Sequence, residues 1–273
     1  MKILSVNAGS SSLKFQLYEM PEEKVLISGL MERIGVENSF YTIKVNGEKI
    51  KKEVELNNHE EAFETLVKEL EENNVVESLD EIEGIGHRVV QGGDYFDKTV
   101  VIDDEVLAKI DELSSLAPLH NPAAVTGIKA AKDVFPNAVQ TAVFDTAFHQ
   151  TMPKENFLYA LPISWYTDLK VRRYGAHGTS HKFVSQRMNE ILKRDDTKII
   201  TCHIGNGASV SAVLNGKCVN TSMGLTPNAG LIMGTRCGDI DASIIPYVME
   251  KTNMSPKEID NAINKESGLL ALS

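Results

Sequence analysis

Two segments of the chain repeat one pattern, in which an apolar strand, a turn of small residues and a second strand follow one another. The first segment reads VNAGSSSLKFQLY from Val6 to Tyr18, and the second reads HIGNGASVSAVLN from His203 to Asn215. Alternating apolar and polar positions on both sides of a Gly/Ser-rich turn are typical of a β-hairpin. The repetition indicates an internal duplication. The chain is therefore restricted to two related units, whose small-residue turns can face one ligand.

The remaining pattern predicts an α/β fold. Apolar side chains recur at helical spacing in 59–72 and 104–116, and Asn121 followed by Pro122 predicts the N-cap and first residue of a further helix. A buried strand is predicted for 139–144. It is followed by Asp145, at the strand end where open α/β sheets bind ligands.

The length of the chain allows two domains. Its 273 residues, of which 42% are hydrophobic, are enough for two cores of ordinary size. We place the domains at 1–147 and 148–273, without a flexible linker between them. Asn215-Gly216 predicts a tight hairpin in the second domain.

Charge and apolar runs exclude several classes of partner. The formal charge of −10, from 28 basic and 38 acidic side chains, argues against binding nucleic acid or an anionic membrane. The sequence shows neither a signal peptide nor an apolar run of membrane-spanning length, so we expect a cytoplasmic protein.

Cys202, Cys218 and Cys237 are expected to be reduced thiols. Without a second close-spaced ligand pair, a structural zinc site is disfavoured.

The small-residue turns suit phosphate, because backbone N–H groups can approach an oxyanion where no Cβ interferes. One Gly-Ser-Ser turn alone is equally an ordinary loop. Two such turns at equivalent places in a duplicated unit favour a phosphate site. Neither is a P-loop, since G-x-x-x-x-G-K-[ST] is absent.

Arg88 and Arg236 lie beside glycines in uncharged surroundings, where a guanidinium needs an anionic partner. That partner is either a ligand or an internal carboxylate, with Asp239 and Asp241 as candidates for Arg236. The spacing leaves both alternatives open.

His120 and His177 lie in short turns, where a histidine is either solvated, capping or functional. His177 and His181 have the spacing of a metal-binding pair on a helix. We expect Ser180 to be the N-cap of that helix, which leaves His177 outside it and argues against a metal pair.

Seven ordered segments closely resemble the acetokinase family. They are VNAGSSSLKF at 6–15, GHRVVQGG at 86–93, APLHNP at 117–122, VFDTAFH at 143–149, RRYGAHGTSH at 172–181, HIGNGAS at 203–209, and TSMGLTP with MGTRCGDID from 221 to 241. The resemblance implies the fold of the sugar kinase and actin superfamily, in which duplicated ribonuclease-H-like (actin-like ATPase) domains enclose a nucleotide. It agrees with the duplication inferred above.

The resemblance also implies an activity. Family members are acetate kinases, which transfer a phosphoryl group reversibly between ATP and acetate, giving acetyl phosphate and ADP, with Mg²⁺ or Mn²⁺, and form homodimers. We expect direct in-line attack by the carboxylate, which is ionised at neutral pH and needs no general base.

The matching motifs assign roles to individual residues. Arg88 and Arg236 would bind the transferring phosphoryl group and the substrate carboxylate, His120 and His177 would donate hydrogen bonds, and Asp145 would lie by the magnesium. Phosphate and nucleotide would be contacted by Ser10, Ser12, Lys14, His203, Asn206 and Gly207, with Asn7 beside the metal.

A small apolar pocket for the acid would be lined by Val90, Leu119, Ala176 and Pro227. The family motif normally carries Phe at the position of Ala176. The lost ring leaves room for extra methylenes, each of which stabilises by about 0.8 kcal/mol when buried. We therefore expect propionate or butyrate to be used better here than by a typical family member.

Family members continue beyond the position of Ser273, so we expect the second domain to be incomplete. If the 273 residues were the whole polypeptide, ATP binding would be weak and exposed apolar surface would favour self-association. Three alternatives remain open: another short-chain acyl kinase, a non-catalytic fragment that binds phosphate or acyl phosphate, and an ATPase that works by domain motion. The third shares the superfamily but lacks the motifs around Arg88, His177 and Arg236.

Overall fold

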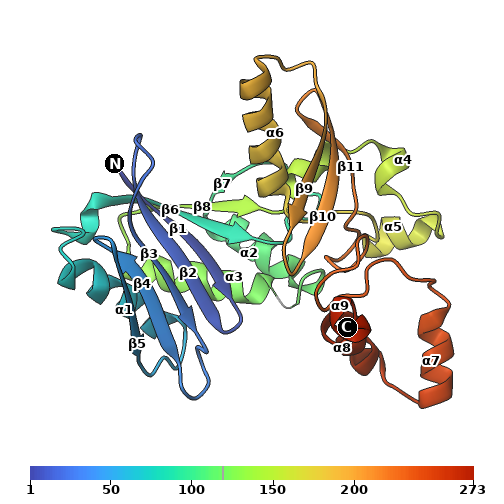
Figure 1. Cartoon of the computed structure of the whole chain (residues 1–273), viewed down its shortest axis with the longest axis horizontal. Helices are drawn as coiled ribbons and strands as arrows, with labels where there is room; N and C mark the ends of the chain where they lie inside the picture. The colour runs from blue at the N-terminus through green and yellow to red at the C-terminus, as the bar shows by residue number, and fades with distance from the viewer. Residues whose placement is uncertain (119) are drawn as a thin grey trace. The chain divides into compact units, whose positions relative to one another are not determined.

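The computed structural model describes residues 1–118 and 120–273. The chain forms two compact units, Met1–Phe144 and Asp145–Ser273, whose elements are labelled in Figure 1. Each unit is described by itself. The mixture of helices and sheets agrees with the predicted α/β class.

The first unit is built on an eight-stranded sheet with the order β5-β4-β3-β2-β1-β6-β8-β7. Strands β1 to β5 form an antiparallel meander, whereas β6 runs parallel to β1 and β8 parallel to β6. The strands are β1 Lys2–Gly9, β2 Ser12–Glu19, β3 Lys24–Glu32, β4 Phe40–Val45, β5 Glu48–Glu53, β6 Ile82–Val89, β7 Val100–Val101 and β8 Val139–Phe144.

Helices of the first unit follow the apolar periodicity. They are α1 His59–Glu72, α2 Asp104–Glu112 and α3 Asn121–Val134, with 3₁₀ turns η1 Leu79–Glu81 and η2 Leu113–Ser115. The range predicted for α1 is confirmed, and the side chain of Asn58 caps it by accepting a hydrogen bond from the backbone N–H of Glu61 at 2.9 Å.

The predicted N-cap of α3 is wrong by one residue. His120 occupies the N-cap, and Asn121 is the first helical residue. The buried side chain of Asn121 bonds the backbone of Gln91 in both directions, at 3.1 Å and 3.0 Å, and also donates to the carbonyl of Ile110. An amide already bonded to other segments cannot fold back to cap its own helix.

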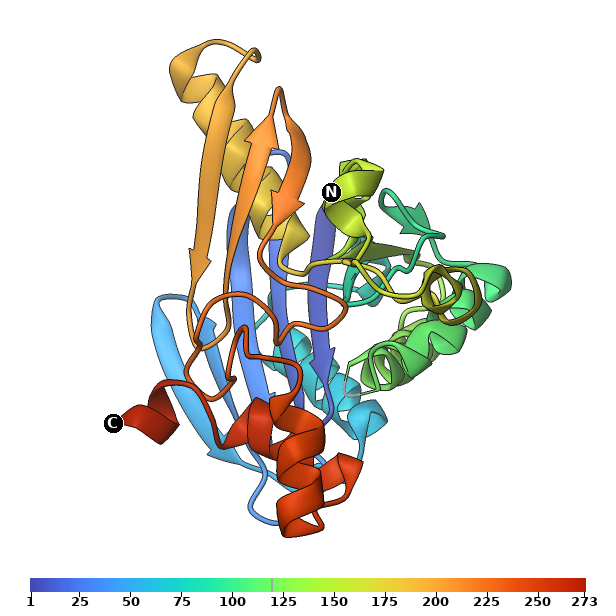
Figure 2. The ribbon, with the colours of Figure 1, turned by 90° about the vertical axis from the view of Figure 1, so that its right-hand side faces the viewer.

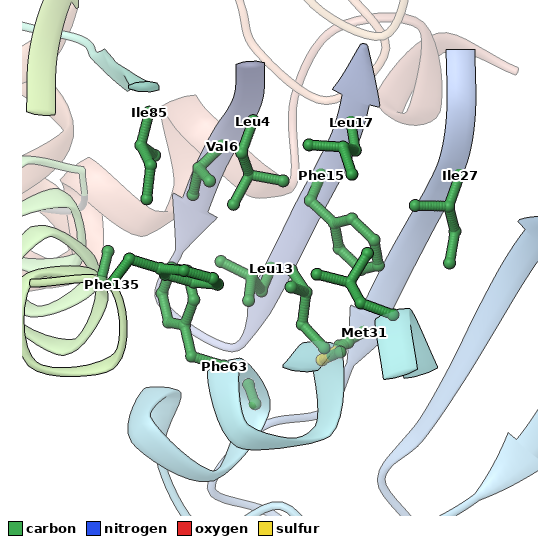
Figure 3. Packing of buried hydrophobic residues seen from close by; sticks show 14 of the residues in the cluster. Leu4, Val6, Leu13, Phe15, Leu17, Ile27, Met31, Phe63, Ile85 and Phe135 are labelled. Carbon is green, nitrogen blue, oxygen red and sulfur yellow. The ribbon is translucent and has the colours of Figure 1, made fainter. Parts of the chain in front are cut away.

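The core of the first unit lies between the sheet and helices α1 and α3. Alternate residues of β1 and β2 point to this face, because successive side chains of a strand point to opposite sides. Phe63 of α1 meets Phe135 edge to face, with ring centroids 6.5 Å apart. Figure 3 shows these rings packed with Leu4, Val6, Leu13, Phe15, Leu17, Ile27, Met31 and Ile85.

The second unit contains a three-stranded antiparallel sheet with the order β11-β10-β9. Its strands are β9 Lys198–Ile204, β10 Ala208–Leu214 and β11 Lys217–Thr221. The predicted Asn215-Gly216 turn joins β10 to β11, and both residues have positive φ, 51° and 75°. Like β1, β2 and β3 of the first unit, these strands form an antiparallel meander, which agrees with the duplication.

Helix α6, Gly178–Leu192, runs along β9 in both views (Figures 1 and 2). It begins at Gly178 with His177 at the N-cap, so the prediction of Ser180 as N-cap is wrong. Ser180 lies in the first turn, and its hydroxyl is bonded to Nδ1 of His203 at 2.9 Å instead of capping the helix.

The other helices of the second unit are η3 Ala147–Thr151, α4 Lys154–Phe157, α5 Ile163–Leu169, α7 Ile244–Thr252, α8 Pro256–Lys265 and α9 Leu269–Leu272. Across residues 1–118 and 120–273, none of the helices combines the length and the apolar character needed to cross a membrane.

Candidate active site

A cavity of about 300 Å³ in the first unit brings together most of the residues predicted there. Its polar lining consists of Asn7, Ser12, Lys14, Arg88 and His120, and Ala8, Gly9, Leu30, Val90 and Ala124 complete the wall. Two cationic side chains in one cavity suit an anionic ligand. Ser10, in the turn between β1 and β2, is exposed and is not among the lining residues.

The strand pairing explains why these side chains meet. Asn7 of β1 lies opposite Lys14 of β2, and Val6 is paired with His87 of the parallel strand β6. Arg88, the next residue, therefore emerges at the same end of the sheet. Helix α3 packs closely there, because a Cβ at Gly127 would lie only 2.7 Å from the Cβ of Ala8.

His87 is a buried neighbour of Arg88 that the sequence analysis did not single out. Its Nε2 lies 2.6 Å from the side-chain oxygen of Gln140 on β8. Burial lowers the pKa of His87 to about 4. The imidazole is therefore neutral at physiological pH and adds no charge beside Arg88.

A second group of predicted residues meets at the turn between β9 and β10. The rings of His177 and His203 are stacked with centroids 4.0 Å apart. A Cβ at Gly207 would lie 3.2 Å from Nη1 of Arg236 and 3.6 Å from Cε1 of His177, so both side chains lie against this glycine. Asn206 contacts the backbone of Gly234, whose N–H donates to the Asn206 carbonyl at 3.0 Å.

Arg236 has no carboxylate partner among the residues that the structure describes. Its guanidinium is half-buried and donates to the carbonyl oxygen of Pro227 at 3.0 Å. Asp239 instead accepts from the N–H of Gly230 at 2.7 Å, and Asp241 from the N–H of Ser243. Burial lowers the pKa of Arg236. A half-buried guanidinium that is bonded only to neutral groups keeps a positive charge that no carboxylate compensates, so it can bind an anionic ligand.

Comparisons with known proteins agree with the motifs. The acetokinase family model matches residues 2–273. The chain belongs to the acetokinase family. Acetate kinases of Macrococcus caseolyticus and Bacillus cytotoxicus are 56% and 57% identical to this chain, and the matches cover 100% of it and 69% of theirs.

Solved structures give the same result. The acetate kinase of Porphyromonas gingivalis matches with a TM-score of 0.94 and 45% identity, covering 100% of this chain and 69% of that one. A propionate kinase from Francisella tularensis matches with a TM-score of 0.95 and 47% identity, covering 99% and 69%. Likeness to both therefore does not decide between acetate and propionate.

Three of the four residues predicted to line the acid pocket lie in the described part of the chain. Ala176 is buried in the second unit, in a cluster with Ala208, Met223 and Met233. Pro227 is half-buried and contacts Arg236 through its carbonyl, and Val90 lines the cavity of the first unit. Leu119 lies outside the described residues.

Asp145 is buried, directly after β8. Its carbonyl oxygen accepts a hydrogen bond from the N–H of Gly178 at 2.8 Å, which holds the start of α6 against this segment. A Cβ at Gly178 would lie 2.2 Å from that oxygen, so this close approach requires glycine. The segments that carry Asp145 and His177 are therefore held together by a backbone hydrogen bond.

Sequence reasoning missed a hydrogen-bonded chain behind His177. Nδ1 of His177 lies 2.8 Å from the hydroxyl of Ser209, which lies 2.7 Å from Nε2 of His181, and Nδ1 of His181 lies 2.7 Å from the hydroxyl of Thr201. The signal in the sequence was the i, i+4 spacing of His177 and His181. This spacing is also typical of a metal-binding pair, which is the only interpretation weighed in the sequence analysis. In the structure the hydroxyl of Ser209 on β10 joins the two rings instead.

Proposed function

We propose that this chain transfers a phosphoryl group reversibly between ATP and a short-chain carboxylate, with acetate giving acetyl phosphate. The observation that carries the proposal is the half-buried guanidinium of Arg236, which has no carboxylate partner in the described part of the chain and lies with His177 against Gly207. Membership of the acetokinase family supports the same reaction.

The proposed chemistry is electrostatic. In phosphoryl transfer, charge spreads over three equatorial oxygens, so positioned cations and N–H donors supply most of the catalysis. Arg88 and Arg236 are assigned to the phosphoryl group and the carboxylate, and His120 and His177 to hydrogen bonds with the same oxygens. The acid attacks in line as a carboxylate, without a general base.

ATP and ADP are the proposed co-substrates, with Lys14, Ser12, His203 and Asn206 contacting phosphate oxygens. Ser10, in the exposed first turn, is retained as a phosphate contact only in this proposal.

Mg²⁺ is the proposed metal, with Mn²⁺ as a substitute. The donor set fits a hard cation, because Asn7 supplies an amide oxygen in the first cavity and Asp145 a buried carboxylate. Mg²⁺ prefers oxygen ligands, keeps several waters and takes one or two carboxylates. No group of three His, Cys, Asp or Glu side chains suited to a metal occurs in residues 1–118 and 120–273. When bound, the metal would neutralise phosphate charge.

A hydroxamate assay tests the activity. The chain is incubated with ATP, Mg²⁺ and acetate, and the acyl phosphate is trapped with hydroxylamine. We expect hydroxamate that depends on all three components. Acyl phosphate binding measured by calorimetry, without any hydroxamate, would instead support the non-catalytic alternative.

The preferred acid is a separate proposal, namely that propionate or butyrate is used well because Ala176 replaces a ring. Ala176→Phe should lower kcat/KM for propionate relative to acetate about fourfold, since one buried methylene stabilises by about 0.8 kcal/mol. The ratio is measured with both acids at equal ATP. A ratio unchanged in a folded variant contradicts the role of Ala176.

A cytoplasmic homodimer is the proposed assembly, by resemblance to the family. Light scattering of the purified chain at several concentrations tests it, and a mass of one copy throughout would contradict it. Neither nucleic acid nor a membrane is a proposed partner, given the charge of −10.

A further inference from the structure

The hydroxyl of Ser209 lies between two imidazoles in the second unit. It is fully buried on β10, 2.8 Å from Nδ1 of His177 and 2.7 Å from Nε2 of His181. A serine hydroxyl has one proton to donate and lone pairs to accept. It therefore donates to one of the two rings and accepts from the other, so their tautomers are coupled.

The chain continues to Thr201 on β9, whose hydroxyl lies 2.7 Å from Nδ1 of His181. His181 is buried, and burial together with the neighbouring histidines lowers its pKa to about 3. At neutral pH it carries one proton, on either Nδ1 or Nε2. Two directions of donation result. Either each group donates toward His177, starting from Thr201, or each donates away from it, ending with the hydroxyl of Thr201, which donates to the carbonyl oxygen of Ser211 at 3.4 Å, longer than an ordinary O–H···O hydrogen bond.

The two directions leave different atoms on the outer edge of His177. Its Nδ1 is turned to Ser209. Its Nε2 faces Gly207, where it lies 3.7 Å from the position that a Cβ would occupy. Nη1 of Arg236 lies 3.2 Å from that same position. Donation toward His177 places the proton of its neutral ring on Nε2. Donation away from His177 leaves a lone pair there, which would repel an anion held by Arg236.

His177 could also present an N–H on Nε2 by taking up a second proton, but the charge of Arg236 beside it disfavours this. The titratable and charged groups near it in the second unit are His203, stacked at 4.0 Å from β9, His181 from α6, His149 from η3 behind His181, Arg236, and the buried Asp145, whose backbone carbonyl accepts from the N–H of Gly178. All of them except Asp145 are basic. A cationic His177 would be placed beside the charge of Arg236.

We propose that Ser209 is a positioning residue, which holds neutral His177 in the tautomer with its proton on Nε2. The inference rests on the proposed function, because it explains how His177 can donate to a phosphoryl oxygen without becoming cationic. Ser209 does not itself touch substrate. It fixes which nitrogen of His177 is the donor.

Nitrogen-15 NMR of the histidine rings tests the tautomer directly and does not depend on activity. The full chain is labelled in histidine, and His177 is assigned by its loss in His177→Asn. We expect Nε2–H at His177 in the wild type and a mixture of tautomers in Ser209→Ala. A wild-type ring protonated on Nδ1, or an unchanged ring in Ser209→Ala, overturns the inference even if the chain is inactive.

Kinetics provide the second readout. At pH 8, kcat of Ser209→Ala should fall about tenfold, less than the 10²–10³-fold that follows removal of a whole transition-state donor. KM for ATP should change little, because Ser209 does not touch substrate. A fall in kcat as large in Ser209→Thr as in Ser209→Ala would indicate a structural defect and would contradict the inference.

Two variants control for packing. Ser211→Ala removes a hydroxyl of the same strand that is also fully buried but is bonded to Thr221 at 2.8 Å and to no histidine. It should leave the His177 tautomer and kcat unchanged. Ser209→Thr keeps the hydroxyl and should keep the wild-type tautomer, whereas a mixture of tautomers in a folded Ser209→Thr would count against the role of the hydroxyl.

Discussion

At the scale of single residues, two side chains have surroundings that neither sequence nor burial alone would predict. Arg236 is half-buried and bonded to a carbonyl oxygen. His87 is buried and bonded to a neutral amide. A charged group kept without a carboxylate indicates a ligand, whereas a titratable group kept neutral indicates a structural role. The two residues therefore call for different measurements.

Arg236→Ala should lower kcat/KM by about 10²–10³-fold, the usual loss when one transition-state donor is removed. Its stability should change little, because the guanidinium is bonded only to a carbonyl and a thioether in the described chain. Arg194→Ala is the matched control, since Arg194 is exposed and paired with Asp196 at 2.8 Å. Equal losses in the two variants would contradict the assignment of Arg236.

His87 should make the folded state sensitive to acid. Its folded pKa of about 4 is below the unfolded value near 6.5, so the unfolded chain binds the extra proton first as pH falls. The stabilisation is complete above pH 6.5 and is lost progressively down to pH 4. Relative to a non-titrating His87→Gln variant, the free energy of unfolding should fall by about 3 kcal/mol over this range. Urea unfolding at several pH values measures the difference, and parallel curves would contradict it.

At the scale of elements, a buried carboxylate joins α1 to strands β4 and β5. Glu69 is 1% exposed and accepts hydrogen bonds from Tyr41 of β4, from Lys52 of β5 at 2.8 Å and from Asn73 after α1. Burial and the hydrogen bond to Glu69 raise the pKa of Tyr41 to about 12. The group fixes how the helix lies on the meander.

Glu69→Ala should lower the free energy of unfolding by about 3 kcal/mol, because it leaves the buried Tyr41 hydroxyl without its acceptor. Glu72→Ala is the control on the same helix. Its carboxylate is half-exposed and 3.8 Å from Lys52, so the loss should stay below about 1 kcal/mol. Denaturant unfolding compares the two, and similar losses would show that the buried group contributes no more than a surface pair.

At the scale of the whole molecule, the proposed reaction requires groups from both units. Arg88 belongs to the first unit and Arg236 to the second. We predict that both act on one phosphoryl group. The free-energy losses of Arg88→Ala and Arg236→Ala in kcat/KM should then be non-additive, with the double variant losing less than the sum. Strictly additive losses would indicate that the two guanidinium groups act independently.

Much of the fold follows from local patterns. The range of α1, strand β8 and the Asn215-Gly216 turn are confirmed, since apolar periodicity and turn chemistry act within a few residues. Helix starts were less predictable. Asn121 and Ser180 are good capping residues, but each bonds another segment of the chain instead. The domain limits at 147 and 148, and the roles of the site residues, stay predictions.

The sequence by itself determined the family, the duplicated hairpin and the residue types of the candidate site, because these depend on motifs that are contiguous in the chain. Only the tertiary structure decided which groups are partnered. It shows Arg236 without a carboxylate among the described residues, Ala176 buried in a cluster that contains two methionines, and Ser209 between two imidazoles. Burial and hydrogen-bond partners depend on residues far apart in sequence, so no local pattern specifies them.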